Sequence, residues 1–535
     1  MENHEHAEAK QANEQKLPWS DAPVYQPKAL FELEKRDVIF AVCGVAASIC
    51  TTAFGLFGGF AFGYLISILV MMTLFCVYLG KKCKLRVFPV MCGLLALANS
   101  AVFVCTTNGS VRFCGVVVSL LLALICFDGF LNGSPKGTRK TLEVFYRASS
   151  TISNIDISVK TLFFNRSGNK KAIGKVLIGL GCAVPVLLVV VPLLIASDDA
   201  FRGMLEDVFQ NTRDAVFKII TGLALSPFVI SYGLSLKTGR VAKFKDKKHT
   251  GVENIYLISF LSAIAMCYIL YLFSQLAYFF SAFQGFLPEG GMTYAQYARK
   301  GFFEMCVIAV INLVLVLTAL LIARKRDGKV SGAVKALATF IGVFTMVIIA
   351  TAISKMVLYI DAYGMTVLRV TTSAFMVFLS VVFICVILRI YIIKINIVKV
   401  SLLAAGCVVL ALGTVNVNAV CARYNYESYQ SGKLDSIDID AIYSLGEEGI
   451  PYIVMLTSDE NTVVVRKAKH YLAKAYLNDY FENFQEMESL NLTELKESNH
   501  KRGFERFSIP RAAAYDSLYA FLEENPEFVT EYKYY

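Results

Sequence analysis

Val38–Leu79, VIFAVCGVAASICTTAFGLFGGFAFGYLISILVMMTLFCVYL, decides the fold, because it holds no charged residue over 42 positions. A helix needs about 20 apolar residues to cross about 30 Å of hydrocarbon, so this stretch is too long for one membrane span and has the length of two. Gly55, Gly59 and Gly63 lie near its middle with GxxxGxxxG spacing. That spacing could form a close helix-packing face, but we favour a tight glycine-rich turn between two spans.

Nine further apolar stretches have the length of a membrane span: Val87–Thr107, Phe113–Leu131, Val176–Ala196, Ala215–Leu236, Ile255–Phe283, Gly301–Ala323, Ala333–Ser354, Val370–Ile390 and Val400–Val420. Hydrophobic residues make up 56% of the 535 residues, charged residues make up 18%, and the mean hydropathy is +0.55. A soluble protein of this length would need more polar surface, so most of the apolar surface must face lipid. The sequence predicts an all-α fold, a polytopic membrane bundle of about eleven transmembrane helices.

Basic residues divide unevenly between the two sets of connections. The N-terminal tail and the connections on its side hold 31 Lys and Arg residues, whereas the opposite connections hold seven. Because Lys and Arg concentrate in cytoplasmic connections, the N-terminus is predicted to be cytoplasmic, and an odd number of spans then exports the C-terminus. We expect a polar cytoplasmic tail over residues 1–37, a transmembrane domain over residues 38–420, and an exported domain over residues 421–535.

The net charge of +10 also divides along the chain, with −8 on residues 421–535 and +18 on the rest. The positive charge therefore belongs to the cytoplasmic side, where it matches anionic lipid, and it does not require a nucleic-acid partner. The longest cytoplasmic connection, Asn132–Lys175, alternates apolar with basic and hydroxyl residues. This alternation predicts an amphipathic helix that lies on the inner leaflet.

The C-terminal domain is predicted to be helical. Leu472, Tyr476, Tyr480 and Phe484 recur every four residues, which is the spacing of one helix face. Pro510, two residues after Ser508, is typical of the first turn of another helix. We expect a small helical array that contains no disulfide of its own.

No motif nominates an enzyme. The GxxxxGK[ST], GxSxG, GxGxxG and HExxH patterns are absent, no CxxC pair exists, and the five histidines are scattered. The sequence therefore predicts no catalytic residue, no metal site and no cofactor. The lipid bilayer is the partner that the composition implies.

Polar side chains inside the spans are more informative, because each is costly in lipid unless it is hydrogen-bonded or paired. Three amides lie within predicted spans, Asn99, Gln275 and Asn312. Interhelical hydrogen bonding is the simplest explanation for them. Glu304 lies near the exported end of its span and requires a cation, for which Arg369 is the leading candidate and Arg299 the next.

Several segments resemble one family in order along the chain. They are Leu194–Phe201 (LIASDDAF), Tyr271–Phe280 (YLFSQLAYFF), Leu287–Glu304 (LPEGGMTYAQYARKGFFE), Ser354–Arg369 (SKMVLYIDAYGMTVLR), Asn416–Asn425 (NVNAVCARYN) and Asp438–Leu445 (DIDAIYSL). Over roughly residues 180–450 the chain resembles bacterial polytopic membrane proteins of unknown function, the DUF4153/DUF4173-like group. At Asp198-Asp199 it departs from the family, which more often has Ala-Asp-Pro. The resemblance implies a fold and a membrane location, and no reaction.

The distinctive polar residues of these segments fall on the exported side in the predicted orientation. They form our candidate site, which comprises Asp198, Asp199, Arg299, Glu304, Tyr359, Asp361, Arg369, Arg423 and Asn425. A scaffold or regulatory protein of the cell envelope, which uses the exported face to bind an envelope or membrane protein, is the first hypothesis. The alternative is a transporter or lipid-handling protein with an outward-facing polar cavity near Glu304 and Arg369. A membrane-embedded enzyme that uses the same carboxylates is a third hypothesis.

Overall fold

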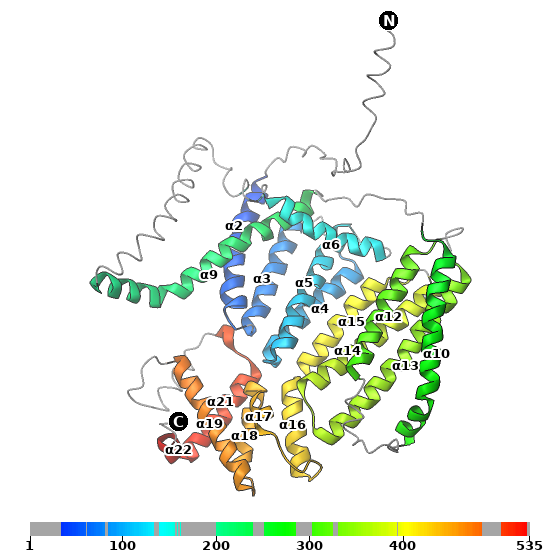
Figure 1. The fold of residues 1–535 in the computed structure, drawn as a ribbon. Helices are drawn as coiled ribbons and strands as arrows, with labels where there is room; N and C mark the ends of the chain where they lie inside the picture. The colour runs from blue at the N-terminus through cyan, green and yellow to red at the C-terminus, as the bar shows by residue number, and fades with distance from the viewer. Residues whose placement is uncertain are drawn as a thin grey trace.

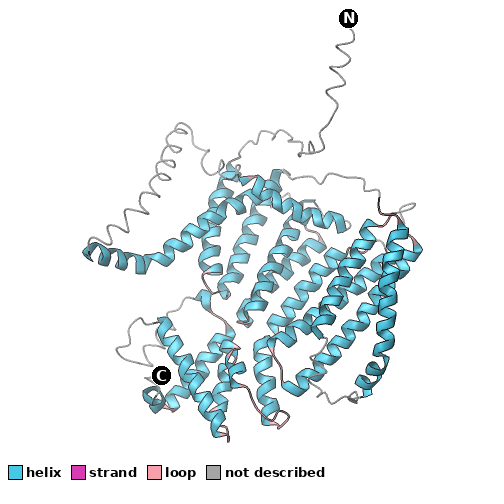
Figure 2. Ribbon diagram, viewed as in Figure 1, coloured by secondary structure: helices cyan, strands magenta, loops and turns pink. Residues whose placement is uncertain are grey.

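The computed structural model of the protein describes residues 34–59, 61–80, 84–132, 138–155, 158, 161, 199–238, 251–284, 302–324, 330–392, 394–483 and 504–531. Within these ranges the chain is helical, apart from connections and one isolated bridge between Val252 and Ala323 (Figure 2). This architecture confirms the predicted all-α fold.

Ten helices among the described residues are long and apolar enough to cross a membrane. They are α2 (Lys35–Cys50) with η1 (Thr51–Leu56), α3 (Phe62–Leu79), α4 (Val87–Cys105), α5 (Gly109–Asn132), α9 (Asp199–Thr238), α10 (Asn254–Gln284), α12 (Phe302–Ile322), α13 (Gly332–Tyr363), α14 (Val367–Tyr391) and α15 (Ile397–Thr414). The prediction of a multi-pass helical membrane protein is confirmed. The additional span expected at Val176–Ala196 lies outside the described residues.

The stretch from Val38 to Leu79 forms two antiparallel spans joined by a turn. α2 continues into the π-helical segment η1, and Gly59 adopts a φ of +76° before α3 begins. Only glycine adopts that conformation without strain, so the favoured glycine turn is present. Gly55 has a second role, because a Cβ at this position would lie 2.9 Å from the Ser67 hydroxyl of α3.

The bundle has two polar faces, which we call the N-terminal face, where α2 begins, and the C-terminal face, on which the C-terminal domain lies (Figure 1). α9 runs antiparallel to α2: Lys237 contacts Asp37 at the start of α2, whereas the Lys218 carbonyl accepts a hydrogen bond from Thr52 in η1. α5 ends on the N-terminal face, where the Phe130 carbonyl accepts a hydrogen bond from the backbone nitrogen of Lys84.

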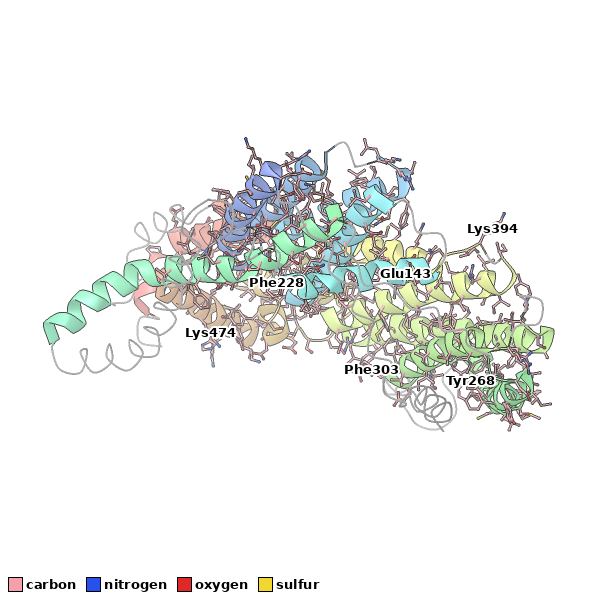
Figure 3. All side chains as sticks on the ribbon, turned by 90° about the horizontal axis from the view of Figure 1, so that it is seen from above. Glu143, Phe228, Tyr268, Phe303, Lys394 and Lys474 are labelled. Atoms are coloured by element: carbon pink, nitrogen blue, oxygen red, sulfur yellow. The ribbon has the colours of Figure 1, made fainter. Side chains whose placement is uncertain are left out.

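The spans form two groups that pack side by side. One core is shared by α2, α3, α4, α5 and α9, and the other is shared by α10, α12, α13 and α14. Viewed from above, Phe228 of α9 and Tyr268 of α10 lie in the different groups (Figure 3). α15 joins the groups, because it packs against α4 and α5 on one side and α14 on the other.

The contact between α15 and α4 depends on Gly413. A Cβ at this position would lie 1.8 Å from Cγ1 of Val102, closer than two non-bonded carbon atoms can approach. Gly413→Ala is therefore expected to force the helices apart and to destabilise the protein by about 1–3 kcal/mol. The midpoint of thermal unfolding in detergent measures this effect. Gly332→Ala is the matched control, since nothing lies within 4 Å of a Cβ there; equal midpoints for the two variants would contradict the account.

The amphipathic connection forms α6 (Thr138–Ser153), which lies across the N-terminal face and carries Glu143 (Figure 3). Thr141 is fully buried and accepts a hydrogen bond from the Asn396 amide, and the Thr151 carbonyl accepts one from the Ser231 hydroxyl. The inward side of α6 therefore packs on the ends of the spans, instead of resting on lipid alone.

The C-terminal domain comprises α16 (Val417–Gln430), α17 (Ile439–Tyr443), η3 (Gly446–Glu448), α18 (Ile450–Leu456), α19 (Thr462–Asn483), η4 (Phe504–Arg506), α21 (Ile509–Glu524) and α22 (Pro526–Glu531). Leu472 and Tyr476 lie in its core with Leu518 and Leu522 of α21, as their spacing predicted. The side chain of Tyr480 and the residue Phe484 lie outside the description.

Candidate functional site

The C-terminal domain is attached to the spans through a buried carboxylate. Glu448, at the end of η3, is 4% exposed. Its Oε1 accepts a hydrogen bond of 2.8 Å from the backbone nitrogen of Thr107, and its Oε2 accepts one from the Thr107 hydroxyl. Thr107 lies in the three-residue connection between α4 and α5, where its amide has no partner within a helix. Glu448 therefore satisfies a donor that the short connection leaves free.

Two asparagines continue this contact. Asn418 of α16 donates a 2.8 Å hydrogen bond to the Leu445 carbonyl and a longer one of 3.4 Å to Oε2 of Glu448. Its Oδ1 accepts a hydrogen bond of 2.7 Å from Asn108. Asn108 also caps α5, because its Oδ1 accepts from the backbone nitrogen of Val111. The network joins the start of a span to two elements of the C-terminal domain; Asn108, Asn418 and Glu448 are buried, and Thr107 is half-buried.

Charged side chains surround the contact between Glu448 and Thr107. Arg112 of α5 donates hydrogen bonds to the carbonyls of Thr106 and Gly59, and both Glu447 and Glu448 attract it electrostatically. Arg511 of α21 pairs with Glu447, with 2.6 Å between Nε and Oε1. The carboxylates of η3 thus connect α21 with the span that carries Arg112.

Asn425 and Arg369 hold the turn between α13 and α14. Asn425 of α16 accepts a 2.7 Å hydrogen bond from the backbone nitrogen of Met365 and donates one of 2.7 Å to its carbonyl. Gly364 has a φ of +75° there, and a Cβ would lie 2.5 Å from Oδ1 of Asn425. The Arg369 guanidinium lies 4.0 Å from the centre of the Tyr359 ring and donates to the carbonyls of Tyr363 and Gly364.

The ion pair expected between Glu304 and Arg369 is absent from the described residues. The donors of Arg369 are used by backbone carbonyls that the Gly364 turn brings close, whereas Glu304 is exposed on α12. The described cation that interacts electrostatically with Glu304 is Lys355, which is 7% exposed. The predicted pairing is therefore wrong: Arg369 begins its span at a depth comparable to that of Glu304, but the Gly364 turn supplies its acceptors.

Asp361 and Arg423 form separate ion pairs at the edge of this region. Asp361 pairs with Lys433 at 2.8 Å and accepts a hydrogen bond from Tyr424. Hydrogen bonding to the Asp361 carboxylate raises the pKa of Lys433 above its usual value. Arg423 pairs with Glu427 on the same helix, and both are exposed. Such exposed pairs contribute little to stability.

The candidate site is therefore only partly assembled. Tyr359, Asp361, Arg369 and Asn425 converge where the α13–α14 turn meets α16, and Arg423 lies on the outer side of that helix. Asp198 and Arg299 lie outside the described residues. Asp199 begins α9, but its side chain lies outside the description.

A pocket of about 490 Å³ opens on the C-terminal face beside this cluster. It lies between the starts of α5 and α14 on one side and α16 and α17 on the other. The polar residues that line it are uncharged: Thr107, Asn108, Thr366, Asn418, Asn425 and Ser444. Of these residues, only Asn425 is among those predicted for the site. The NVN sequence at Asn416–Asn418 does not reveal that both asparagines contact α4 or the connection that follows it.

The amides within the spans link helices. Asn312 of α12 accepts a 2.6 Å hydrogen bond from Tyr268 of α10 and donates one of 2.9 Å to Thr345 of α13. Asn99 of α4 donates to the carbonyl of Gly406 in α15 at 3.1 Å. The side chain of Gln275 lies outside the description. Among the described residues no group of three or more His, Cys, Asp and Glu could hold a metal ion.

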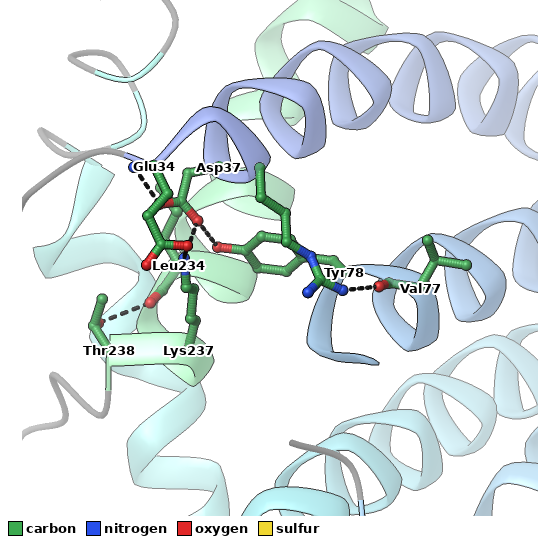
Figure 4. Close-up of polar contacts among 8 residues, drawn as sticks. Glu34, Asp37, Val77, Tyr78, Leu234, Lys237 and Thr238 are labelled. Atoms are coloured by element: carbon green, nitrogen blue, oxygen red, sulfur yellow. Dashed lines mark hydrogen bonds and ion pairs between the residues drawn. The ribbon is translucent and has the colours of Figure 1, made fainter. Parts of the chain in front are cut away.

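A polar cluster that the sequence analysis missed lies on the N-terminal face (Figure 4). Asp37 of α2 is fully buried, pairs with Lys237 of α9 at 2.7 Å and accepts a 2.6 Å hydrogen bond from the Tyr78 hydroxyl of α3. Lys237 also pairs with Glu34 at 2.9 Å. Phe40 stacks on the Tyr78 ring and shields the cluster. The sequence feature that indicates this cluster is the position of Asp37 directly before an apolar run, where an unpaired carboxylate is unfavourable.

Comparison with known proteins identifies a family for this chain but does not identify an activity. No curated protein matches the chain, and no solved structure matches it. The matched family model is described as "Domain of unknown function (DUF4153)" and covers residues 65–456. The match begins within α3, so it includes spans that precede the quoted motifs. Because it covers well over half of the chain, the protein belongs to the DUF4153 family.

Proposed function

We propose that this integral membrane protein is a scaffold or regulator of the cell envelope. Its C-terminal domain and the C-terminal face of its spans would form one recognition surface for an envelope or membrane protein. The observation that carries the proposal is the buried contact of Glu448 with Thr107, which fixes the extramembrane domain to the spans. A rigid composite surface suits binding, because little ordering is required when a partner arrives.

The polar groups inside the spans also support this proposal. A transport path requires polar side chains that are free to exchange partners with a substrate. Asn312 instead bonds to Tyr268 and Thr345, and Asn99 bonds to backbone carbonyls. Asn312 and the Nδ2 group of Asn99 thus connect neighbouring helices, as in a structural bundle, whereas Oδ1 of Asn99 has no hydrogen-bond partner among the described residues.

The orientation forms part of the proposal. Basic residues concentrate in the connections on the side of the N-terminal tail, which favours a cytoplasmic N-terminal face. α5 ends on that face, whereas α9 passes Thr52 on the opposite face before it reaches Asp37. A further crossing between α5 and α9 is consistent with the eleventh span proposed at Val176–Ala196. The C-terminal domain would then be extracytoplasmic.

A lipid-handling function is the second candidate, and the pocket favours it. The cavity of about 490 Å³ adjoins the ends of α5 and α14, and its uncharged hydroxyl and amide groups suit a neutral polar headgroup. Arg369 lies one residue beyond the lining residue Leu368, whereas Glu304 is not among the lining residues.

A photo-cross-linking amino acid at Ser444 tests both candidates in native membranes, because this exposed residue lines the pocket. The scaffold proposal predicts a protein adduct that disappears when Glu448→Ala releases the domain. An adduct with the mass of a lipid would instead support lipid handling. The same probe at Val463, which is 61% exposed in α19, is the control for random capture. Equal adducts at the two positions would contradict both candidates.

A further inference from the structure

We propose that Phe504–Ile509 of the C-terminal domain is an interfacial anchor, which inserts into the lipid bilayer beside the ends of α2 and α3. In Figure 1 the chain before α21 reaches the lower ends of the spans, and η4 packs against α3. The proposal requires only that the spans cross a membrane, and it is independent of which face is cytoplasmic.

Two contacts fix the depth of the segment. The Phe504 ring stacks on the Phe54 ring, with 5.9 Å between their centres, and Phe54 belongs to the candidate span Lys35–Leu56. The Phe507 carbonyl accepts a 3.2 Å hydrogen bond from the backbone nitrogen of Phe62, the first residue of α3. The segment therefore lies level with the last turn of one span and the first turn of the next. That depth corresponds to the boundary between acyl chains and headgroups.

The segment exposes its apolar residues at this depth. Phe504 is 60% exposed, Phe507 51% and Ile509 56%, whereas Ser508 and Pro510 are buried. The buried pair fixes the backbone to the protein, so the large apolar side chains point outward. In water, three such neighbours would leave a costly apolar patch, but in the bilayer interface they are favourable.

The patch continues a surface that must face lipid. Leu56 at the end of the first span is 39% exposed, and Phe217 of α9 is 57% exposed. Phe217 packs edge-on against Phe57, next to Leu56, at 5.4 Å between ring centres. Lipid surrounds these spans. Lipid is therefore also the molecule that contacts the exposed Phe504 side chain beside them. Exposed Arg506 can extend its guanidinium toward lipid phosphates.

Tryptophan fluorescence with acyl-chain-brominated phosphatidylcholine tests the anchor in the full chain. Trp19 is the single tryptophan of the sequence, so Trp19→Phe provides a background without this fluorophore. In that background Phe507→Trp should lose about half of its emission in brominated vesicles relative to unbrominated ones, because its ring contacts acyl chains. Phe504→Trp is a second conservative reporter, and its emission should fall to a similar extent in brominated vesicles.

Val463→Trp is the matched control. Val463 is 61% exposed and is the second residue of α19. α19 begins at the end of the domain away from the spans in Figure 1. Its emission should be equally strong in the two kinds of vesicle. Unquenched, blue-shifted emission from both Phe504→Trp and Phe507→Trp would show that a protein surface covers the segment, and it would overturn the proposal. Unquenched emission at the wavelength of exposed tryptophan, or quenching no stronger than that of Val463→Trp, would also overturn it.

Discussion

Lys237→Met is expected to destabilise the protein by about 3–5 kcal/mol, because it leaves the buried Asp37 carboxylate without its cation. Asp37 is fully buried, and Lys237 is 14% exposed and lies 2.7 Å away. The Tyr78 hydrogen bond cannot replace the lost charge. Since the pair joins α2 to α9, the change should loosen the α9 contact first. Denaturant unfolding in mixed micelles measures the loss of free energy.

The double variant separates the ion pair from other effects of the substitution. Asp37→Asn with Lys237→Met removes both charges, so it should be more stable than Lys237→Met alone. Lys433→Met is the matched control, because the pair of Lys433 with Asp361 is about half exposed and contributes little. Strictly additive losses at Asp37 and Lys237 would refute the pairing.

Glu448→Ala is expected to release the C-terminal domain from the spans. The change removes the buried acceptor of the backbone nitrogen and hydroxyl of Thr107 and leaves these donors of a half-buried residue without their partner. A loss of about 2–4 kcal/mol follows for hydrogen bonds to a buried charge. Hydrogen exchange in the full chain is the measurement: the Thr107 amide should exchange roughly 100-fold faster in the variant, in line with that free energy.

Glu427→Ala is the control for Glu448→Ala, because Glu427 is exposed and pairs only with Arg423 in the described chain. It should leave exchange at Thr107 unchanged. Glu448→Gln separates charge from shape, since the amide oxygen can still accept one hydrogen bond, and an intermediate rate is expected. Rapid exchange of the Thr107 amide in the unaltered protein would show that Glu448 does not hold it.

The sequence predicts the spans well, because apolar runs of span length have few alternatives in a membrane. Val38–Leu79 divides at Gly59, the position where a turn requires a residue with positive φ. The helix face through Leu472 and Tyr476 is likewise buried in the C-terminal domain. Both features depend on local periodicity, which sequence alone reveals.

The polar contacts between distant segments could not be predicted in this way. Glu447 and Glu448 are adjacent and chemically identical, but only Glu448 faces Thr107, more than 300 residues earlier in the chain. The positions of Arg369 and Glu304 near span ends predict an ion pair between them. The Gly364 turn instead supplies carbonyls to Arg369. The packing of the helices determines which polar groups contact each other. The spacing of these groups in the sequence does not reveal those contacts.

The recognition surface proposed for this protein must face away from the cytoplasm, and a topology reporter tests that claim most directly. Alkaline phosphatase, which is active only after export, should be active when fused after Tyr535 and inactive when inserted within residues 237–248. The basis is the division of 31 against seven basic residues between the two sets of connections. An inactive fusion after Tyr535 together with an active insertion at residues 237–248 would contradict the account.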